Sequence, residues 1–373
     1  MDIQSTVEGI ESGDEQTLDY VLRTSSLACV VLRQETIFNI NFTIINLLKE
    51  ITTMRLIKLI IFLIVTVILI SVGTHLFNNK QEFTPPSRHS KIPADSVKIL
   101  PGNDLNPPLS ESPEYYDPVP VTGLVNTAGG EDSAFVLPDG ETLYFFFTPD
   151  VRIPVEEQIK DKVTGIYRSK KNSDSWEEPE RIILQDPGKL AMDGCQYING
   201  DEMYFCSARE GYTGLHWFKA EKIGDTWTNW LNVDEELKTE EHEVGELYIS
   251  ADGKRLYFHS TREGGEGMYD IWFSDKTGDE WGEPVNLEVV NTEGNEGWPC
   301  LSIDENELWF SKDYGIWRTK NVEGEWTEPE RMFFPLAGEP SLDVHGNVYF
   351  THHFFKNDTM LEADIYVAYR KTS

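Results

Sequence analysis

The chain has 373 residues, with 64 acidic and 32 basic side chains, so its formal net charge at pH 7 is −32. This charge repels phosphate backbones and anionic lipid surfaces, which excludes nucleic acid as a partner. A content of 39% hydrophobic and 12% aromatic residues excludes a disordered chain, and 28 glycines with 19 prolines predict a globular protein rich in turns.

The N-terminal part contains one candidate membrane segment. Residues 59–77 carry no formal charge, and a helix of that length, at about 1.5 Å per residue, crosses a bilayer core of about 30 Å. Arg55 and Lys58 precede it, so the remainder is expected outside the cytoplasm, in the periplasm or the extracellular space. Residues 54–77 are therefore predicted to be an uncleaved signal anchor. The alternative is a cleaved secretory signal that begins at Met54.

The segments on either side of this anchor have no predicted fold. Residues 1–53 stay unassigned and would be absent if translation began at Met54. Residues 78–112 are rich in Pro, Ser and Asn and have no sustained apolar period, which predicts an extended stalk.

A sequence pattern recurs five times after residue 113. Its first half is a strand, a polar turn and a second strand, as in LPDGETLYFFF, INGDEMYFCS, SADGKRLYFHS, SIDENELWFS and DVHGNVYFTH. Its second half is a third strand, followed in the first four repeats by a polar turn and a tryptophan, at positions 176, 227, 281 and 326. Each repeat thus offers four short strands, as a blade of a β-propeller does.

The last repeat predicts how the ring closes. It ends at the C-terminus without a fourth strand, whereas residues 114–119 (EYYDPV) match residues 280–285 (EWGEPV) of the third repeat. We expect the N-terminal segment to complete the last blade, so that residues 113–373 form one five-bladed, all-β propeller. A two-sheet sandwich is the alternative, but it does not explain the displaced fourth strand.

Residues 250–275, SADGKRLYFHSTREGGEGMYDIWFSD, resemble the WD40-like (PD40) repeat of TolB-type β-propellers. That repeat has the pattern SxDGxxLYFxSxRxG followed by DIY or DIW. This chain departs from it at Asn199-Gly200 and His345-Gly346, where the family has Asp-Gly, and in its five repeats where TolB has six blades. The resemblance implies a binding or scaffolding propeller of the cell envelope rather than a particular reaction.

The four cysteines include no CxxC pair, so a cysteine zinc site is not expected. A hairpin turn at Gly200-Asp201 would place Cys195 opposite Cys206, where an oxidising compartment could join them in a disulfide. The alternative is two small buried side chains.

A binding face is predicted where the loops that enter the innermost strands meet the loops that join the second and third strands. The acids there are Glu131, Asp132, Asp193, Glu246, Glu296 and Glu339, and the bases are Arg209, Arg262, Lys312 and His352. Trp298 could stack on a sugar ring. Asp193, Glu246 and Glu296 could hold calcium, and no other cofactor is expected. Alternatively, each acid pairs with a neighbouring base and fastens the blades together.

The sequence favours a propeller that binds a protein or a polysaccharide at this face and has no catalysis of its own. The alternative is a carbohydrate-active enzyme, a glycoside hydrolase or lyase, with Asp132, Asp193 and Glu296 as its catalytic acids. Motifs of serine hydrolases, zincins and nucleotide-binding proteins are absent from the sequence.

Overall fold

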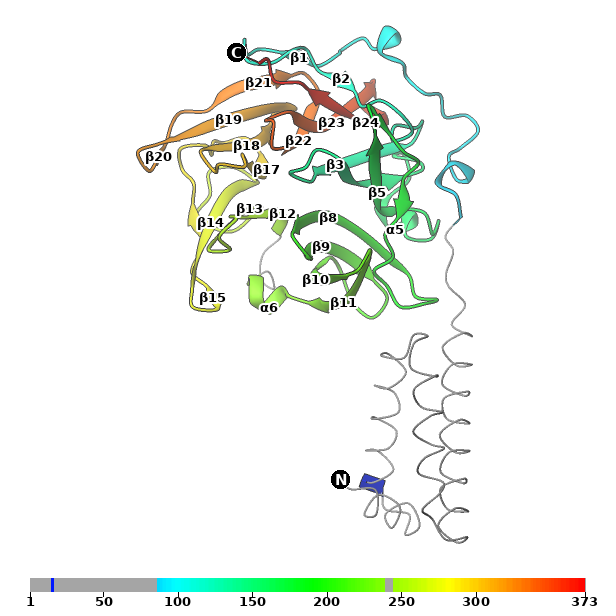
Figure 1. Cartoon of the computed structure of the whole chain (residues 1–373), viewed down its shortest axis with the longest axis horizontal. Coiled ribbons are helices and arrows are strands. Elements are labelled where there is room, and N and C mark those ends of the chain that lie inside the picture. The colour runs from blue at the N-terminus through cyan, green and yellow to red at the C-terminus, as the bar shows by residue number, and fades with distance from the viewer. Residues whose placement is uncertain (1–14, 17–85, 239–243, 373) are drawn as a thin grey trace, which may run out of the picture. The chain divides into compact units, whose positions relative to one another are not determined.

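The computed structural model describes residues 15–16, 86–238 and 244–372 (Figure 1). The chain divides into two compact units, Met1–Phe83 and Thr84–Ser373. The predicted anchor, residues 54–77, and nearly all of the unassigned residues 1–53 lie outside the described residues. Within the described ranges, no helix has both the length and the apolar character needed to cross a membrane.

The second unit is all-β in its described residues, as predicted, and its helices are single turns. These are η1 (Arg88–Ser90), η2 (Pro101–Asn103), α5 (Val155–Gln158) and α6 (Asp234–Leu237). The strands form antiparallel sheets, an architecture consistent with a β-propeller.

Each sequence repeat folds as an antiparallel meander in which a strand pairs with the next one along the chain. Repeat 1 contains β3 (Gly130–Val136), β4 (Thr142–Thr148), β5 (Gly165–Asn172), β6 (Ser175–Trp176) and β7 (Glu180–Arg181). Repeat 2 contains β8 (Ala191–Asn199), β9 (Glu202–Arg209), β10 (His216–Ile223) and β11 (Thr226–Asn232). Repeat 3 contains β12 (Val244–Ile249), β13 (Arg255–Ser260), β14 (Asp270–Thr277), β15 (Glu280–Trp281) and β16 (Val285–Asn286).

The last two repeats also take up strands from the N-terminal side of the unit. Repeat 4 contains β17 (Glu296–Leu301), β18 (Glu307–Lys312), β19 (Gly315–Val322), β20 (Glu325–Trp326) and β21 (Glu330–Phe334), and β21 pairs with β1 (Leu109–Ser110). Repeat 5 contains β22 (Ala337–Leu342), β23 (Val348–Lys356) and β24 (Thr359–Ala368), and β24 pairs with β2 (Val119–Pro120). One parallel pair, Ala363 with Gly130, links β24 to β3.

The repeated aromatic residues form the contacts between neighbouring repeats. The five anchor residues on the second strands, which are Tyr144, Tyr204, Tyr257, Trp309 and Tyr349, are all at most 5% exposed. Ring centroids lie 6.4 Å apart for Trp227 on Tyr144, 6.5 Å apart for Trp326 on Tyr257 and 6.2 Å apart for Trp176 on Tyr349. In each pair, the tryptophan of one repeat packs edge-on against the anchor of the neighbouring repeat. For repeats 2 and 4 that neighbour is the preceding repeat in the chain, and for repeat 1 it is repeat 5.

Residues 86–112, which we call the N-terminal strap, contact the sheets, whereas the sequence predicted a stalk over residues 78–112. Arg88 is buried and donates to the carboxylate of Glu131 and the carbonyl of Val125. The ammonium of Lys98 binds both Glu362 and Asp364. A Pro- and Ser-rich composition indicates missing regular structure, but it does not reveal such individual contacts with distant residues.

Candidate functional site

The first strand of every repeat carries a β-bulge at the same place. The pairing register shifts by one residue after Asp132, Gly194, Val244, Gly297 and Gly338. The bulged pairs are Ser133-Ala134, Cys195-Gln196, Gly245-Glu246, Trp298-Pro299 and Glu339-Pro340. A bulge bends the strand and re-aims its side chains.

Four of these bulges hold a residue other than glycine in the left-handed region. The φ angles are 50° at Ser133, 53° at Cys195, 54° at Trp298 and 60° at Glu339. Such a conformation costs about 1–2 kcal/mol per residue, and its repetition at equivalent places points to a functional constraint.

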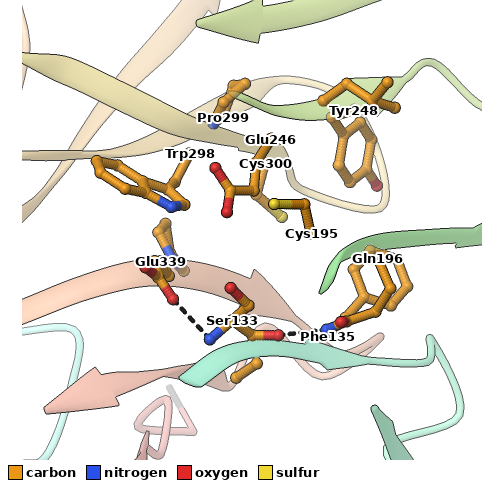
Figure 2. A pocket seen from close by; sticks show the side chains of 13 residues that line it. Ser133, Phe135, Cys195, Gln196, Glu246, Tyr248, Trp298, Pro299, Cys300 and Glu339 are labelled. Atoms are coloured by element: carbon orange, nitrogen blue, oxygen red, sulfur yellow. Dashed lines mark hydrogen bonds between the residues drawn. The ribbon is translucent and has the colours of Figure 1, made fainter. Parts of the chain in front are cut away.

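All the bulged residues except Gly245 line a small cavity of about 40 Å³, which we call the central cavity. Figure 2 shows Cys195, Glu246 and Trp298 from different repeats pointing toward one another there. Trp298 and Glu339 also line an adjoining cavity of about 310 Å³, which we call the lateral cavity. The other residues that line the lateral cavity are Asn295, Ser311, Lys312, Asp313, Tyr314, Ala337, Gly338 and His353.

Three predicted ligand residues instead fasten the fold. Glu131, Asp193 and Glu296 occupy the same place, two residues before the bulge, and all three are fully buried. Their carboxylates bind Arg88 Nη1 at 3.2 Å, Arg209 Nη2 at 2.7 Å and Lys312 Nζ at 2.9 Å, respectively. Each acid is therefore paired with a base, but the pairs of Asp193 and Glu296 lie within one repeat and do not join two repeats.

Glu131 and Glu296 also brace the loops that precede their strands. Glu131 accepts hydrogen bonds from the Thr127 backbone N–H at 2.8 Å and its hydroxyl at 2.7 Å. The hydroxyl of Thr292 donates to Glu296 in the same way, at 2.6 Å. The segments that contain these pairs are similar in sequence, VNTAGGED at residues 125–132 and VNTEGNEG at residues 290–297, and this shared bracing accounts for the similarity.

The calcium set and the catalytic set predicted from sequence do not come together. Asp193 and Glu296 each hold a base within their own repeat, while Glu246 lines the central cavity. In the described chain, the group of acids and histidines with metal-ligand spacing is a different one, Asp132, Glu339 and His353.

The predicted bases also divide. Arg209 binds Asp193, and Lys312 binds Glu296 but also lines the lateral cavity. The guanidinium of Arg262 lies over the rings of Phe258, at 4.6 Å, and Trp272, at 5.4 Å.

The two adjacent histidines of β23 lie in different surroundings, and His352 does not line the lateral cavity. Its ring is fully buried, with Nε2 at 3.0 Å from Asp104 of the N-terminal strap and Nδ1 at 3.0 Å from the Leu336 carbonyl. The next residue, His353, lines the lateral cavity. Because consecutive strand residues face opposite sides, the period of two was the available signal. Tyr314 was missed as well, since the turn after β18 carries no motif.

Trp298 is held in place by a buried histidine. Its backbone N–H donates to His259 Nδ1 at 3.1 Å, and the two ring centroids lie 4.9 Å apart. Burial lowers the pKa of His259 to about 3, so this imidazole is neutral, and its proton must lie on Nε2 because Nδ1 accepts. That Nε2 lies 3.6 Å from a carboxylate oxygen of Glu246.

The carboxyl groups of Asp132 and Glu339 lie close together, with one oxygen of each within 4.8 Å. Burial, together with the charge of Asp132, raises the pKa of Glu339 well above its usual range. Burial alone would raise the pKa of Asp132 too, but its contacts with Glu339 and His353 lower it. Glu339 further accepts from the Ser133 N–H at 2.6 Å and the Thr351 hydroxyl at 3.2 Å.

The bulge also changes the predicted cysteine pairing. Near the turn the register is as expected, with Tyr197 opposite Tyr204, but beyond the bulge Cys206 faces Gly194 instead of Cys195. Both cysteines are free thiols. A hydrogen bond with Cys206 and burial raise the pKa of the Cys195 thiol.

Comparisons with known proteins show remote structural likeness only. No family model and no curated protein matches the chain. A TolB-like protein from Agrobacterium tumefaciens matches with 17% identity and a TM-score of 0.38, over 62% of this chain and 73% of the other. An exo-β-1,3-galactanase from Clostridium thermocellum matches with 12% identity and a TM-score of 0.44, over 69% and 63%. A gluconolactonase from Xanthomonas campestris matches with 11% identity and a TM-score of 0.41, over 71% and 95%. These values assign neither an activity nor a ligand to this chain.

Proposed function

We propose that the unit is a five-bladed β-propeller of the WD40-like kind that binds a sugar or a glycan end in the lateral cavity. The five-blade arrangement is supported by contacts between first strands, which run from β3 to β8, β12, β17, β22 and back to β3. Its closure by β2 is supported by the pairing of Val119 with Val367, and the tryptophan contacts follow the same cyclic order.

We infer the class of ligand from the position of the Trp298 ring. Its indole lines a cavity of about 310 Å³ together with the ring of Tyr314, and this volume lies at the small end of ligand pockets. The indole N–H of Trp298 faces the Glu246 carboxylate in the central cavity (Figure 2), so the ring face is the part of this side chain that a sugar would contact. Sugars stack an apolar ring face on aromatic side chains and use hydroxyls as hydrogen-bond partners. The amide of Asn295 and the charged groups of Asp313 and Lys312 suit those hydroxyls.

Binding without hydrolysis is the better supported reading of the carboxyl groups. Glycoside hydrolases keep their two catalytic carboxyl groups about 5–9.5 Å apart, with the scissile bond between them. Of the three predicted catalytic acids, Asp193 and Glu296 are fully buried in ion pairs with Arg209 and Lys312, so neither is available to a substrate. Asp132 has a ligand oxygen within 4.8 Å of one of Glu339, slightly closer than this range.

The location of the propeller is part of the same proposal. We propose that residues 54–77 anchor the chain in a membrane, with the propeller outside the cytoplasm, and this rests on the sequence pattern alone. Protease treatment of intact cells that express the chain with a C-terminal tag tests it. The tag should be lost in intact cells, whereas protection until lysis would contradict the proposal.

Ligand binding is tested by calorimetric titration of the full chain in detergent with a panel of mono- and oligosaccharides. Trp298→Ala should weaken the best ligand by about tenfold or more. The control Tyr116→Ala removes a 59% exposed ring far from the cavity and should change nothing. Absence of any saccharide binding, or equal binding by Trp298→Ala, would reject the proposal, and turnover of an oligosaccharide would favour the enzyme instead.

A further inference from the structure

Three metal-ligating side chains meet where repeat 1 adjoins repeat 5. Asp132 comes from β3, Glu339 from the bulge of β22 and His353 from β23, and one ligand atom of each lies within 4.8 Å of the others. Glu339 and His353 also line the lateral cavity.

These residues are departures from the repeat rather than copies of it. The register places Gly194, Val244, Gly297 and Gly338 where repeat 1 has Asp132. At the position of Glu339, the other four repeats have Ser133, Cys195, Gly245 and Trp298. The general abundance of acids in this chain therefore does not account for this group.

Among the described residues, no arginine or lysine pairs with Asp132 or Glu339, whereas Glu131, Asp193 and Glu296 each bind one. Asp132 Oδ1 is buried and forms no hydrogen bond among these residues, although about one-third of the Asp132 side chain is exposed. His353 Nε2 lies 3.9 Å from Asp132 Oδ1, which is too long for a hydrogen bond. Leaving a buried polar atom unsatisfied costs about 1–3 kcal/mol, so Asp132 Oδ1 suits a further partner that carries positive charge.

We propose that Asp132, Glu339 and His353 bind a divalent transition-metal ion of the Zn²⁺ or Mn²⁺ type. Imidazole nitrogen with carboxylate oxygen suits these ions, whereas Ca²⁺ and Mg²⁺ take oxygen ligands. With metal–ligand bonds of about 2.1 Å, the 3.9 Å between Asp132 Oδ1 and His353 Nε2 corresponds to an angle of about 135° at the ion. Small side-chain rotations reach the usual coordination angles.

Three protein ligands leave at least one coordination position open, as in metal sites that bind an external ligand. Because Glu339 and His353 line the lateral cavity, that position faces the space where we propose that the sugar binds. The metal site does not depend on the sugar, since it is built entirely from this chain's own side chains.

The test is calorimetric titration of EDTA-treated full chain in detergent with Zn²⁺, Mn²⁺ and Ca²⁺, without saccharide. Wild type should bind one equivalent of Zn²⁺ or Mn²⁺ more tightly than Ca²⁺, and His353→Gln should weaken this binding by about 100-fold or more. The control His345→Gln alters an exposed histidine and should leave it unchanged. Co²⁺ should give a ligand-field absorption spectrum in wild type that is lost in His353→Gln.

A second variant protects against a folding artefact. Glu339→Gln keeps the shape of the side chain that accepts from Ser133 and should weaken Zn²⁺ binding, while Glu323→Gln removes the same charge from the exposed surface and should not. Equal metal binding by wild type and His353→Gln, or a preference for Ca²⁺, would overturn the proposal. Saccharide titration in EDTA then tests the sugar site separately.

Discussion

The indole N–H of Trp227 donates to the hydroxyl of Tyr144 at 3.3 Å, while the two rings pack edge to face. The pair joins repeat 2 to repeat 1, and both side chains are at most 3% exposed. Two sequence positions that recur with the repeat therefore form its interface with the repeat before it. Equivalent ring contacts join repeat 4 to repeat 3 and repeat 1 to repeat 5.

Trp227→Ala should destabilise the fold by about 3–5 kcal/mol, because it leaves a cavity at the interface between two repeats. Tyr144→Phe should cost about 1 kcal/mol, since it removes only the hydrogen bond. Urea unfolding followed by tryptophan fluorescence and circular dichroism measures both. Trp230→Ala, at a half-buried position on the same strand, should cost less than Trp227→Ala, and equal costs would show that the interface is not special.

Lys98→Ala should loosen the N-terminal strap. The ammonium of Lys98 compensates Glu362 and Asp364, whose side chains are 1% and 3% exposed, so its loss leaves two buried acids without their partner. We expect a destabilisation of about 2–4 kcal/mol and faster proteolysis within residues 86–112. Lys91→Ala, at an exposed position of the same segment, is the control. Unchanged proteolysis in Lys98→Ala would mean that other contacts hold the strap.

Acid should weaken the link between the N-terminal segment and repeat 4. Hydrogen bonds from Arg318 lower the pKa of Glu114 from 4.5 to about 2. A lowered folded pKa gives stability that is complete above about pH 4.5 and is lost as the pH falls toward 2. Since Glu114 is one-third exposed, we expect a contribution of about 2 kcal/mol, after allowance for solvent screening.

Urea unfolding at pH 7, 4.5 and 3 measures this contribution. Glu114→Gln should be less stable than wild type at pH 7, and the difference should shrink at pH 3. The exposed substitution Glu323→Gln should show no such pH dependence. A difference between Glu114→Gln and wild type that does not change with pH would rule out the titration of Glu114 as its cause.

The left-handed bulge in β3 predicts an unusual response to glycine. Ser133 has φ of 50°, so Ser133→Gly should be more stable than Ser133→Ala by about 1 kcal/mol, because glycine adopts this conformation without steric cost. At the next residue the order should reverse, and Ala134→Gly should be less stable than wild type. Thermal unfolding of the variants measures these differences in stability. A Ser133→Ala protein as stable as Ser133→Gly would show that the bulge carries no strain.

The repeat made most of the scaffold predictable from the sequence. Alternating apolar residues and polar turns predicted the strands. Val119, the last residue of the matched segment 114–119, and Pro120 just beyond it pair with β24. The aromatic positions were recognised as packing residues because they recur, whereas their partners in the preceding repeat depend on the three-dimensional arrangement.

The site was less predictable because its residues depend on a one-residue shift. Glu131 and Asp132 are adjacent acids, yet one is buried against Arg88 and the other contacts Glu339. Composition does not distinguish the two acids. In four of the five repeats the left-handed residue of the bulge is not a glycine, so no glycine in the sequence marks the bulge. The same shift moved Cys195 out of register with Cys206. The contact of His352 with Asp104 spans 248 residues, which no local pattern reveals.

The bulged residues do not take part in the regular strand pairing that holds each repeat together. Each repeat contributes two residues that stand outside regular pairing, and these range from serine and cysteine to tryptophan and glutamate while the flanking register is maintained. The side chain at these positions can therefore differ between repeats without a change in the flanking strand pairing. Gly245 is the exception, because a side chain there would collide with the ring of His259.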